Sequence, residues 1–145
     1  MLCVKQILHN SFVLKKAYES RWTAISEKYA FTLVEIEVLG FLANNPELNT
    51  ARDIVRYRQI AKSHVSKAVD NLTARGYLRS EPAAEDRRCN RLTVTAEAEE
   101  AVQAIRLTQC GFAAALLEGI TDEERAQLAA ISDRITANAI KLLGE

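Results

Sequence analysis

The stretch from Ile60 to Thr95 constrains the fold of this chain of 145 residues more than any other part. Its first half predicts a helix, because apolar side chains recur there at helical spacing. These side chains are Val65, Ala68, Val69 and Leu72. Gly76 then stands where the residue after a helix often takes a left-handed backbone, so the helix is expected to end there. Two short β-type segments follow, 77–80 and 91–95, joined by a charged loop.

A shorter helix is expected just before this one, from Ala51 to about Tyr57. Thr50 is a suitable N-cap, and Asp53 places a negative charge in the first turn. About four residues separate the two helices, which is the spacing of a helix-turn-helix. With the hairpin, the pair outlines a winged helix-turn-helix. In that arrangement the second helix enters the major groove of DNA, and the hairpin tip reaches the minor groove or the backbone.

Two helices are predicted ahead of this region. The first is expected to run without a break from Leu2 to about Tyr29, since an approximate apolar stripe follows that segment. The second, from Phe31 to Asn44, has a capping box in which Thr32 is the N-cap and Glu35 stands three residues later. Two further long helices are expected after the hairpin.

The third long helix is expected from Thr95 to about Glu118, and the last from Asp122 to about Leu143. Gly119 ends the third, and Thr121 with Glu124 forms a capping box for the last. The expected fold class is therefore mainly α with a small β-hairpin wing. A small DNA-binding domain does not need such long apolar helices for itself, and a second copy would bury them.

These patterns predict how the chain is divided. Residues 1–30 and 96–145 are expected to form a helical dimerisation region, and residues 31–95 a winged helix-turn-helix DNA-binding domain. A two-fold dimer would present two such helices to a palindromic site.

The net charge is zero, but the charges are segregated along the chain. From Ala51 to Arg91 ten basic residues stand against five acidic ones, which leaves +5. Residues 92–145 carry four basic and nine acidic residues, which leaves −5. Positive charge is thus concentrated on the predicted winged helix-turn-helix, the segment expected to bind DNA. Chance segregation of charge is the alternative interpretation.

Several classes of protein lack support in the sequence. No apolar run approaches the ~18 residues of a membrane span, and the first residues do not have the pattern of a secretory signal. No glycine-rich phosphate loop, nucleophile motif or Cys/His cluster with ligand spacing is present. A cytoplasmic protein is expected, with no catalytic site, no metal, no cofactor and no membrane partner.

The chain resembles the MarR family of bacterial transcription regulators, which are dimeric winged helix-turn-helix proteins. The resemblance covers most of the chain and is strongest from Phe31 to Thr95. Three motifs carry it: Lys62-Ser63-His64-Val65-Ser66-Lys67, Gly76-Tyr77-Leu78, and Asp86-Arg87-Arg88 followed by Leu92-Thr93-Val94-Thr95. They are similar to the start of the family's recognition helix, its helix-to-strand junction, and its wing with the return strand.

The resemblance implies a set of DNA-binding residues. They are Lys62, Ser63, His64, Ser66, Lys67, Asp86, Arg87, Arg88 and Arg91. Those of the recognition helix would face base edges and phosphates in the major groove. Arg88 would approach the minor groove, and Asp86 would hold that arginine by a charge-assisted hydrogen bond. Arg87 and Arg91 would contact phosphates.

Three positions in the turn between the two helices depart from the family's pattern. Gln59 stands where glycine is usual, Ala61 where a serine cap is usual, and Arg58 where an apolar residue is common. The departures concern the geometry of the turn and the first residue of the recognition helix. They leave the charge pattern and the wing intact.

Members of this family often bind a small effector, frequently an aromatic acid, between the dimerisation helices and the DNA-binding domain. His9, Tyr18, Trp22 and Tyr29 are the candidates for lining such a cleft. The simpler interpretation is that they belong to the core and the interface.

Three widely spaced cysteines do not form a disulfide framework, and reduced thiols are the expected state. Cys89 follows two arginines that favour a thiolate. Cys3 lies near the terminus outside a matching motif, and Cys110 falls in an apolar helix, where a place in the core or the interface is expected. The expected function is that of a homodimeric repressor on a pseudo-palindromic operator, released by a small-molecule effector. A thiol-based redox-sensing regulator and a winged-helix protein-interaction module are the alternatives.

Overall fold

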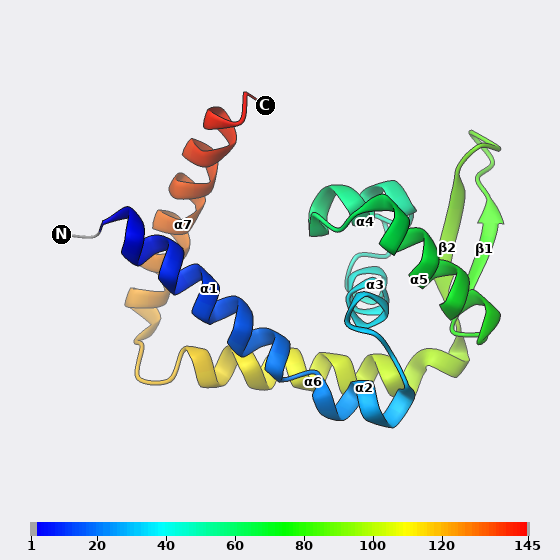
Figure 1. Ribbon diagram of the computed structural model, residues 1–145, viewed down its shortest axis with the longest axis horizontal. Coiled ribbons are helices and arrows are strands. Elements are labelled where there is room, and N and C mark those ends of the chain that lie inside the picture. Colours follow the sequence, from blue (N-terminus) through cyan, green and yellow to red (C-terminus); the bar gives the residue numbers. More distant parts are fainter. Residues whose placement is uncertain (1–2, 145) are drawn as a thin grey trace. The chain divides into compact units, whose positions relative to one another are not determined.

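The computed structural model describes residues 3–144, so Leu2 lies outside the described residues. The elements are α1 Val4–Ser20, α2 Thr23–Tyr29, α3 Leu33–Asn44, α4 Ala51–Arg58, α5 Lys62–Ala74, β1 Leu78–Pro82, β2 Asn90–Val94, η1 Ala96–Ala98, α6 Glu99–Leu116 and α7 Asp122–Leu142 (Figure 1). The fold is mainly α with one antiparallel hairpin, as predicted. The chain divides into two compact units, Met1–Cys110 and Gly111–Glu145.

The prediction of one continuous helix at the start of the chain is wrong, because the helix is broken between α1 and α2. The backbone N–H of Arg21 bonds to the carbonyl of Tyr18 at 3.1 Å, and that of Trp22 to the carbonyl of Glu19 at 3.3 Å. These tighter i to i−3 bonds end α1 and redirect the chain. Trp22 and Ile25 are buried in the core, whereas no residue described in α1 is buried.

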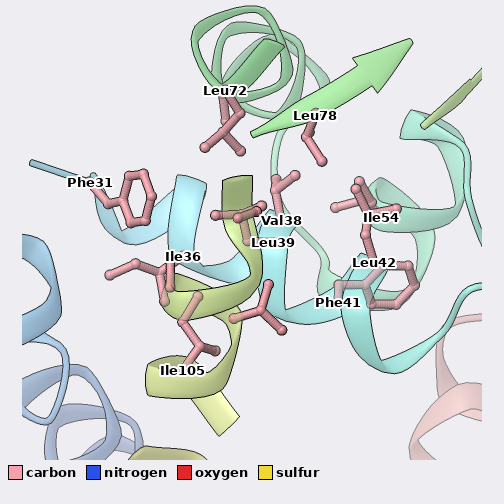
Figure 2. Packing of buried hydrophobic residues seen from close by; sticks show 14 of the residues in the cluster. Phe31, Ile36, Val38, Leu39, Phe41, Leu42, Ile54, Leu72, Leu78 and Ile105 are labelled. Carbon is pink, nitrogen blue, oxygen red and sulfur yellow. The ribbon is translucent and has the colours of Figure 1, made fainter. Parts of the chain in front are cut away.

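The core of the first unit is built around α3. Its capping box is confirmed: Glu35 N–H donates to Thr32 Oγ1 at 3.2 Å, and Thr32 N–H to Glu35 Oε2 at 3.0 Å. From Glu35 to Leu42, every residue of α3 except Glu37 is buried. Side chains from other elements pack around it, among them Ile54 of α4, Leu72 of α5 and Ile105 of α6 (Figure 2). Burial of each such side chain contributes roughly 1.5–3 kcal/mol, so these contacts hold the two helices of the helix-turn-helix against α3.

The end of α5 is the glycine-dependent stop that the sequence predicted. Gly76 has a φ of +80°. The N–H of Gly76 donates to the carbonyl of Thr73 at 3.0 Å, and the N–H of Tyr77 donates to the carbonyl of Leu72 at 2.9 Å. This pair of bonds is a Schellman motif. It turns the chain directly from α5 into β1.

The hairpin that follows pairs β1 and β2 in antiparallel register, with Leu78 opposite Val94 and Glu81 opposite Arg91. Leu78 and Leu92 are buried and anchor the hairpin to the core, and the segment 83–89 forms its tip. The backbone N–H of Leu92 also donates to the carbonyl of Asn49 at 2.8 Å. This bond ties the hairpin to the loop before α4.

The helix after the hairpin begins later than expected. Thr95 is followed by a short 3₁₀ turn, and α6 itself begins at Glu99. The Thr95 hydroxyl does not cap the helix, because it donates to the carbonyl of Gly76 at 2.6 Å. Thr95 therefore serves the junction between α5 and the hairpin.

In the second unit, α7 starts with the predicted capping box, in which Glu124 N–H donates to Thr121 Oγ1 at 3.2 Å. No residue described in α7 is buried, and apolar side chains such as Leu128, Ile131 and Ile135 are exposed. Over residues 3–144, no helix is long and apolar enough to cross a membrane.

Candidate nucleic-acid interface

A hollow of about 710 Å³ lies in the first unit between α4, α5 and the hairpin. Val55, Val69 and Leu92 contribute apolar surface to it. Polar and basic side chains also line it, among them Arg52, Lys62, Ser66, Arg88 and Asn90. A concave surface lined by cations on two sides suits a polyanion.

The N-terminal half of α5 presents the predicted residues to solvent. Lys62, Ser63, His64, Ser66 and Lys67 are all exposed. The opposite side of the same helix is buried through Val65, Ala68 and Leu72. The amphipathic pattern read from the sequence therefore sets which side of α5 faces outward.

The start of α5 also leaves backbone donors open. Its N-cap is Ala61, which makes no side-chain cap bond, so the N–H groups of Lys62 and Ser63 have no helical acceptor. Donors at a helix N-terminus, where the helix dipole is positive, are favourable partners for an anion such as a phosphate. The replacement of the family's usual serine cap by Ala61 thus leaves these donors uncapped by a side chain.

The hydrogen bonds and the ion pair of the hairpin tip differ from those that were expected. Asp86 Oδ1 accepts from the backbone N–H of Arg88 at 2.9 Å, so Asp86 shapes the backbone of the tip and does not hold the guanidinium as predicted. The ion pair at the wing joins Glu85 to Arg91 Nη2, with both carboxylate oxygens at 2.6 Å. Hydrogen bonding from Arg91 lowers the pKa of Glu85 below its usual value. Arg87 and Arg88 are exposed.

The ten basic residues counted between Ala51 and Arg91 are not equivalent in the structure. Arg58 pairs with Glu37 at 3.5 Å, Arg79 with Glu81 at 3.0 Å, and Arg91 with Glu85. Arg75 donates to the backbone carbonyls of Tyr29 and Ala30, at the C-terminal end of α2. Within residues 3–144 no ion pair occupies the other six, which are Arg52, Arg56, Lys62, Lys67, Arg87 and Arg88. These six are the cations available to an external anion.

The turn between α4 and α5 accommodates its unusual residues. Gln59 adopts the left-handed conformation, with φ +54°, and this is the conformation that favours glycine. Its side-chain amide donates to the carbonyl of Arg56 at 2.8 Å. Arg58 is partnered by Glu37, and its guanidinium lies 5.7 Å from the ring centre of Phe41. A charged residue is therefore tolerated where an apolar one is common.

Two of the four candidate effector residues lie together. The rings of Tyr18 and Trp22 meet edge to face at 5.3 Å. The indole N–H of Trp22 is buried and has no acceptor among the described residues. Burial and the nearby Glu37 carboxylate raise the pKa of Tyr18. This pair combines an apolar surface with a donor that is not satisfied.

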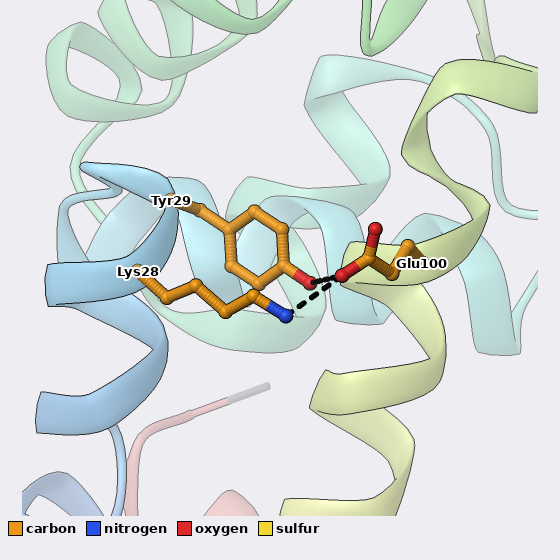
Figure 3. A network of polar contacts seen from close by, with 3 residues as sticks. All are labelled: Lys28, Tyr29 and Glu100. Carbon is orange, nitrogen blue, oxygen red and sulfur yellow. Dashed lines mark hydrogen bonds and ion pairs between the residues drawn. The ribbon is translucent and has the colours of Figure 1, made fainter.

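The other two candidates lie elsewhere. His9 is exposed on α1. Tyr29 stacks on Phe31 at 5.4 Å, and its hydroxyl donates to Glu100 Oε1 at 3.0 Å (Figure 3). Lys28 Nζ binds the same oxygen at 2.7 Å. Tyr29 thus belongs to a contact between α2 and α6.

The cysteines are all free thiols. Cys3 and Cys110 are exposed, and Cys89 is half-buried where it lines the hollow beside Arg88. Within residues 3–144, no group of three or more His, Cys, Asp or Glu side chains is arranged to hold a metal ion.

Solved structures share this fold. A MarR protein from Peptoclostridium difficile is 20% identical, with a TM-score of 0.80 over 96% of this chain and 92% of that one. The S. aureus MepR–DNA complex is 19% identical, with a TM-score of 0.73 over 94% and 96%. BpsR of Bordetella bronchiseptica, described for regulation of its DNA binding by 6-hydroxynicotinic acid, is 20% identical, with a TM-score of 0.63 over 88% and 98%. No curated protein sequence matches the chain.

The match to a family model covers the part of the chain that holds this interface. Residues 31–88 match the model of the MarR family, from the residue before the α3 cap to the arginine at the wing tip. This segment contains α3, the helix-turn-helix, β1 and most of the hairpin tip. The motifs, the fold and the family model agree, and over residues 31–88 the chain is similar to the MarR family.

Proposed function

We propose that this protein is a transcription regulator that binds double-stranded DNA through α5 and the hairpin. One observation carries the proposal: Lys62 of α5 and Arg88 of the wing tip, neither of which is held in an ion pair, line the same hollow. A DNA backbone passing through this hollow would place α5 in the major groove and Arg88 toward the neighbouring minor groove. Such a protein acts where the DNA of a bacterium lies, in the cytoplasm.

The candidate contacts divide into two kinds. Ser63, His64 and Ser66 have polar side chains suited to base edges. Lys62, Lys67, Arg87 and Arg88 supply charge for phosphates or the minor groove. Arg91 and Asp86 contribute indirectly, because Arg91 is engaged by Glu85 and Asp86 by the backbone of the tip.

We further propose that the regulator is a homodimer and a repressor on a pseudo-palindrome, with half-sites about 34 Å apart. Exposed apolar side chains on α1, such as Leu8 and Phe12, support an interface there, and those on α7 support one in the second unit. Residues 1–30 and 96–145 are the proposed dimerisation region.

A small aromatic effector is the natural ligand class for the pair of Tyr18 and Trp22. Its ring would extend their edge-to-face contact, and an acceptor on it would satisfy the buried indole N–H. The structure of BpsR is described for control of DNA binding by an aromatic acid, and this supports the ligand class proposed here. Such a ligand would act by favouring one spacing of the two α5 helices.

The test begins with selection of bound duplexes from a random pool, followed by fluorescence anisotropy across a salt series. We expect a palindromic site whose affinity falls steeply with salt. Lys67→Ala and Arg88→Ala should each weaken binding and reduce the salt slope by about one. Lys15→Ala removes the same charge from an exposed position of α1 outside the hollow and is the control; with the mass on a sizing column unchanged, neither the affinity nor the salt slope should change.

Binding that is blind to sequence would contradict a regulator with a defined operator. If neither Lys67→Ala nor Arg88→Ala changes DNA affinity while the dimer persists, the surface formed by α5 and the wing tip does not read DNA. The winged helix would then be assigned to a protein partner.

A further inference from the structure

We propose that Arg75 is a positioning residue that locks the C-terminal end of α5 to α2, and so sets the orientation in which α5 meets DNA. The inference rests on the proposed function, because it concerns how a DNA-reading helix is held. By sequence Arg75 counts among the basic residues of the DNA-binding stretch. Its contacts in the structure give it a different task.

The guanidinium of Arg75 is held by hydrogen bonds to the end of α2. Its Nη1 donates to the carbonyl of Ala30 at 3.1 Å, and its Nη2 donates to the carbonyl of Tyr29. These carbonyls lie at the C-terminal end of a helix, where backbone acceptors lack helical donors and the helix dipole is negative. A cation with two parallel donors fits both requirements at once.

Two aromatic rings that also contact each other lie against the same guanidinium. The guanidinium carbon lies 4.9 Å from the ring centre of Phe31 and 5.1 Å from that of Tyr77. Phe31 is buried and stacks on Tyr29, and Phe31 also meets Tyr77 edge to face at 5.2 Å. The planar guanidinium suits this arrangement, whereas an ammonium group has neither the fork nor the flat face.

The contact continues from α2 to α6. The hydroxyl of Tyr29 donates to Glu100, and Lys28 binds the same carboxylate oxygen (Figure 3). Arg75 at the end of α5 is therefore joined through Tyr29 to α6, all within the first unit. α2 and the start of α6 belong to the proposed dimerisation region. This chain of contacts therefore fixes the position of α5 relative to the helices that would set the spacing between two protomers.

A second contact, one turn earlier, holds the same end of α5 against α3. Asn71 donates to Glu35 Oε1 at 3.1 Å, and Glu35 is buried where it caps α3. Arg75 and Asn71 together hold the C-terminal half of α5, while its N-terminal half carries the exposed residues for DNA. Loss of the Arg75 contacts would let α5 pivot without removing any group that meets DNA.

This arrangement predicts a distinct signature for Arg75→Lys, which keeps the charge and loses the fork and the flat face. We expect affinity for the selected palindromic duplex to fall by roughly two- to thirtyfold, with the salt slope unchanged. Tyr77→Leu, which removes one of the two rings, should act in the same direction. Discrimination against duplexes with one extra base pair between the half-sites should weaken in both variants.

Four outcomes separate the possibilities, with all measurements made well below each variant's unfolding midpoint. Reduced affinity at constant salt slope supports the proposal. Wild-type affinity and slope in Arg75→Lys, with a slope lower by about one in Arg75→Ala, would mean that Arg75 contacts a phosphate. A lower unfolding midpoint with unchanged DNA affinity would reduce Arg75 to a structural role. Absence of salt-dependent binding by the unaltered chain would instead overturn the proposed function, and this inference with it.

Discussion

At the scale of single residues, backbone conformation explains two positions that side-chain chemistry does not. Gly76 and Ala30 both follow a helix and both have positive φ, +80° and +51°. Glycine adopts this conformation without strain, whereas alanine is strained there. The two positions therefore provide opposite tests of the same physical effect.

Gly76→Ala is expected to lower the free energy of unfolding by about 1 kcal/mol. A methyl group at Gly76 meets no atom within 4 Å, so the whole effect arises from the backbone. Ala30→Gly is expected to raise the free energy of unfolding by roughly 0.5–1 kcal/mol. Urea denaturation of the two variants measures both, and changes of the same sign would contradict this account.

The cation count illustrates how residues of one type take different roles. Arg88, Arg91 and Arg75 are alike in the sequence, but Arg88 is exposed without an ion pair, Arg91 is paired with Glu85, and Arg75 donates to carbonyls at the C-terminal end of α2. A charge map drawn from the sequence treats them as equal. The structure reduces the set of cations free to contact DNA.

At the scale of elements, capping boxes begin three helices, with Thr32, Thr50 and Thr121 as N-caps. In each box the residue three positions later is acidic and returns a hydrogen bond to the N-cap N–H. The box of α4 is internal to the helix-turn-helix, and Thr50 also lines the hollow proposed for DNA.

Thr50→Ala is expected to destabilise the fold by about 1 kcal/mol, which is typical for loss of an N-cap. The same substitution at Thr121, in the second unit, provides a matched control of equal chemistry. Both variants should lose stability in thermal unfolding. We expect the Thr50 variant also to weaken DNA binding, because it loosens the start of α4, whereas equal effects on DNA binding would contradict a local role.

The contact between α2 and α6 predicts a dependence of stability on pH. Lys28 lowers the pKa of Glu100 below 4.5, and Glu100 raises the pKa of Lys28 above 10.5. A lowered carboxylate pKa stabilises the fold above about pH 4.5 and loses this effect as pH falls through the folded value. A raised lysine pKa stabilises below about pH 10.5 and loses the effect as pH rises through the folded value.

Glu100→Gln should therefore be slightly less stable than the unaltered chain between these limits. The difference should vanish in acid, when Glu100 is protonated. Urea midpoints of both chains from neutral to acidic pH measure the effect, which is small because both side chains are exposed. A difference that persists in acid would assign the effect to something other than charge.

At the scale of the whole molecule, apolar side chains remain exposed on helices of both units. In the first unit Leu8 and Phe12 are exposed, and in the second Leu128, Ile131 and Ile135. A chain whose terminal helices keep such surfaces uncovered is expected to bury them against another copy.

Ile131→Glu and Phe12→Glu should each shift the protein from dimer to monomer, because a carboxylate would have to be buried without a partner. Light scattering on a sizing column measures the mass directly. The variants should also lose affinity for the palindrome and keep weak binding to a half-site. A monomeric mass for the unaltered chain would overturn the proposed interface.

The local features were open to prediction from the sequence. The helix stop at Gly76, the capping boxes and the alternation of apolar residues are set by neighbours close in sequence, so the order of elements and the exposed side of α5 followed from them. The fold class was predicted correctly, and the family model matches the segment where the resemblance was strongest, because these signals agree with each other.

Tertiary structure alone decided what each distant pair does. The break between α1 and α2 occurs where the large ring of Trp22 is buried in the core. No pattern of neighbouring residues predicted this burial. Glu37, Glu85 and the carbonyl of Ala30 each capture an arginine that the sequence left free. Glu37 lies far from Arg58 in the sequence, and Ala30 lies far from Arg75. Glu85 lies only six residues from Arg91, but the two face each other across the hairpin tip. Such pairs depend on how the elements pack, and packing is determined by the three-dimensional fold and not by the spacing of residues along the chain.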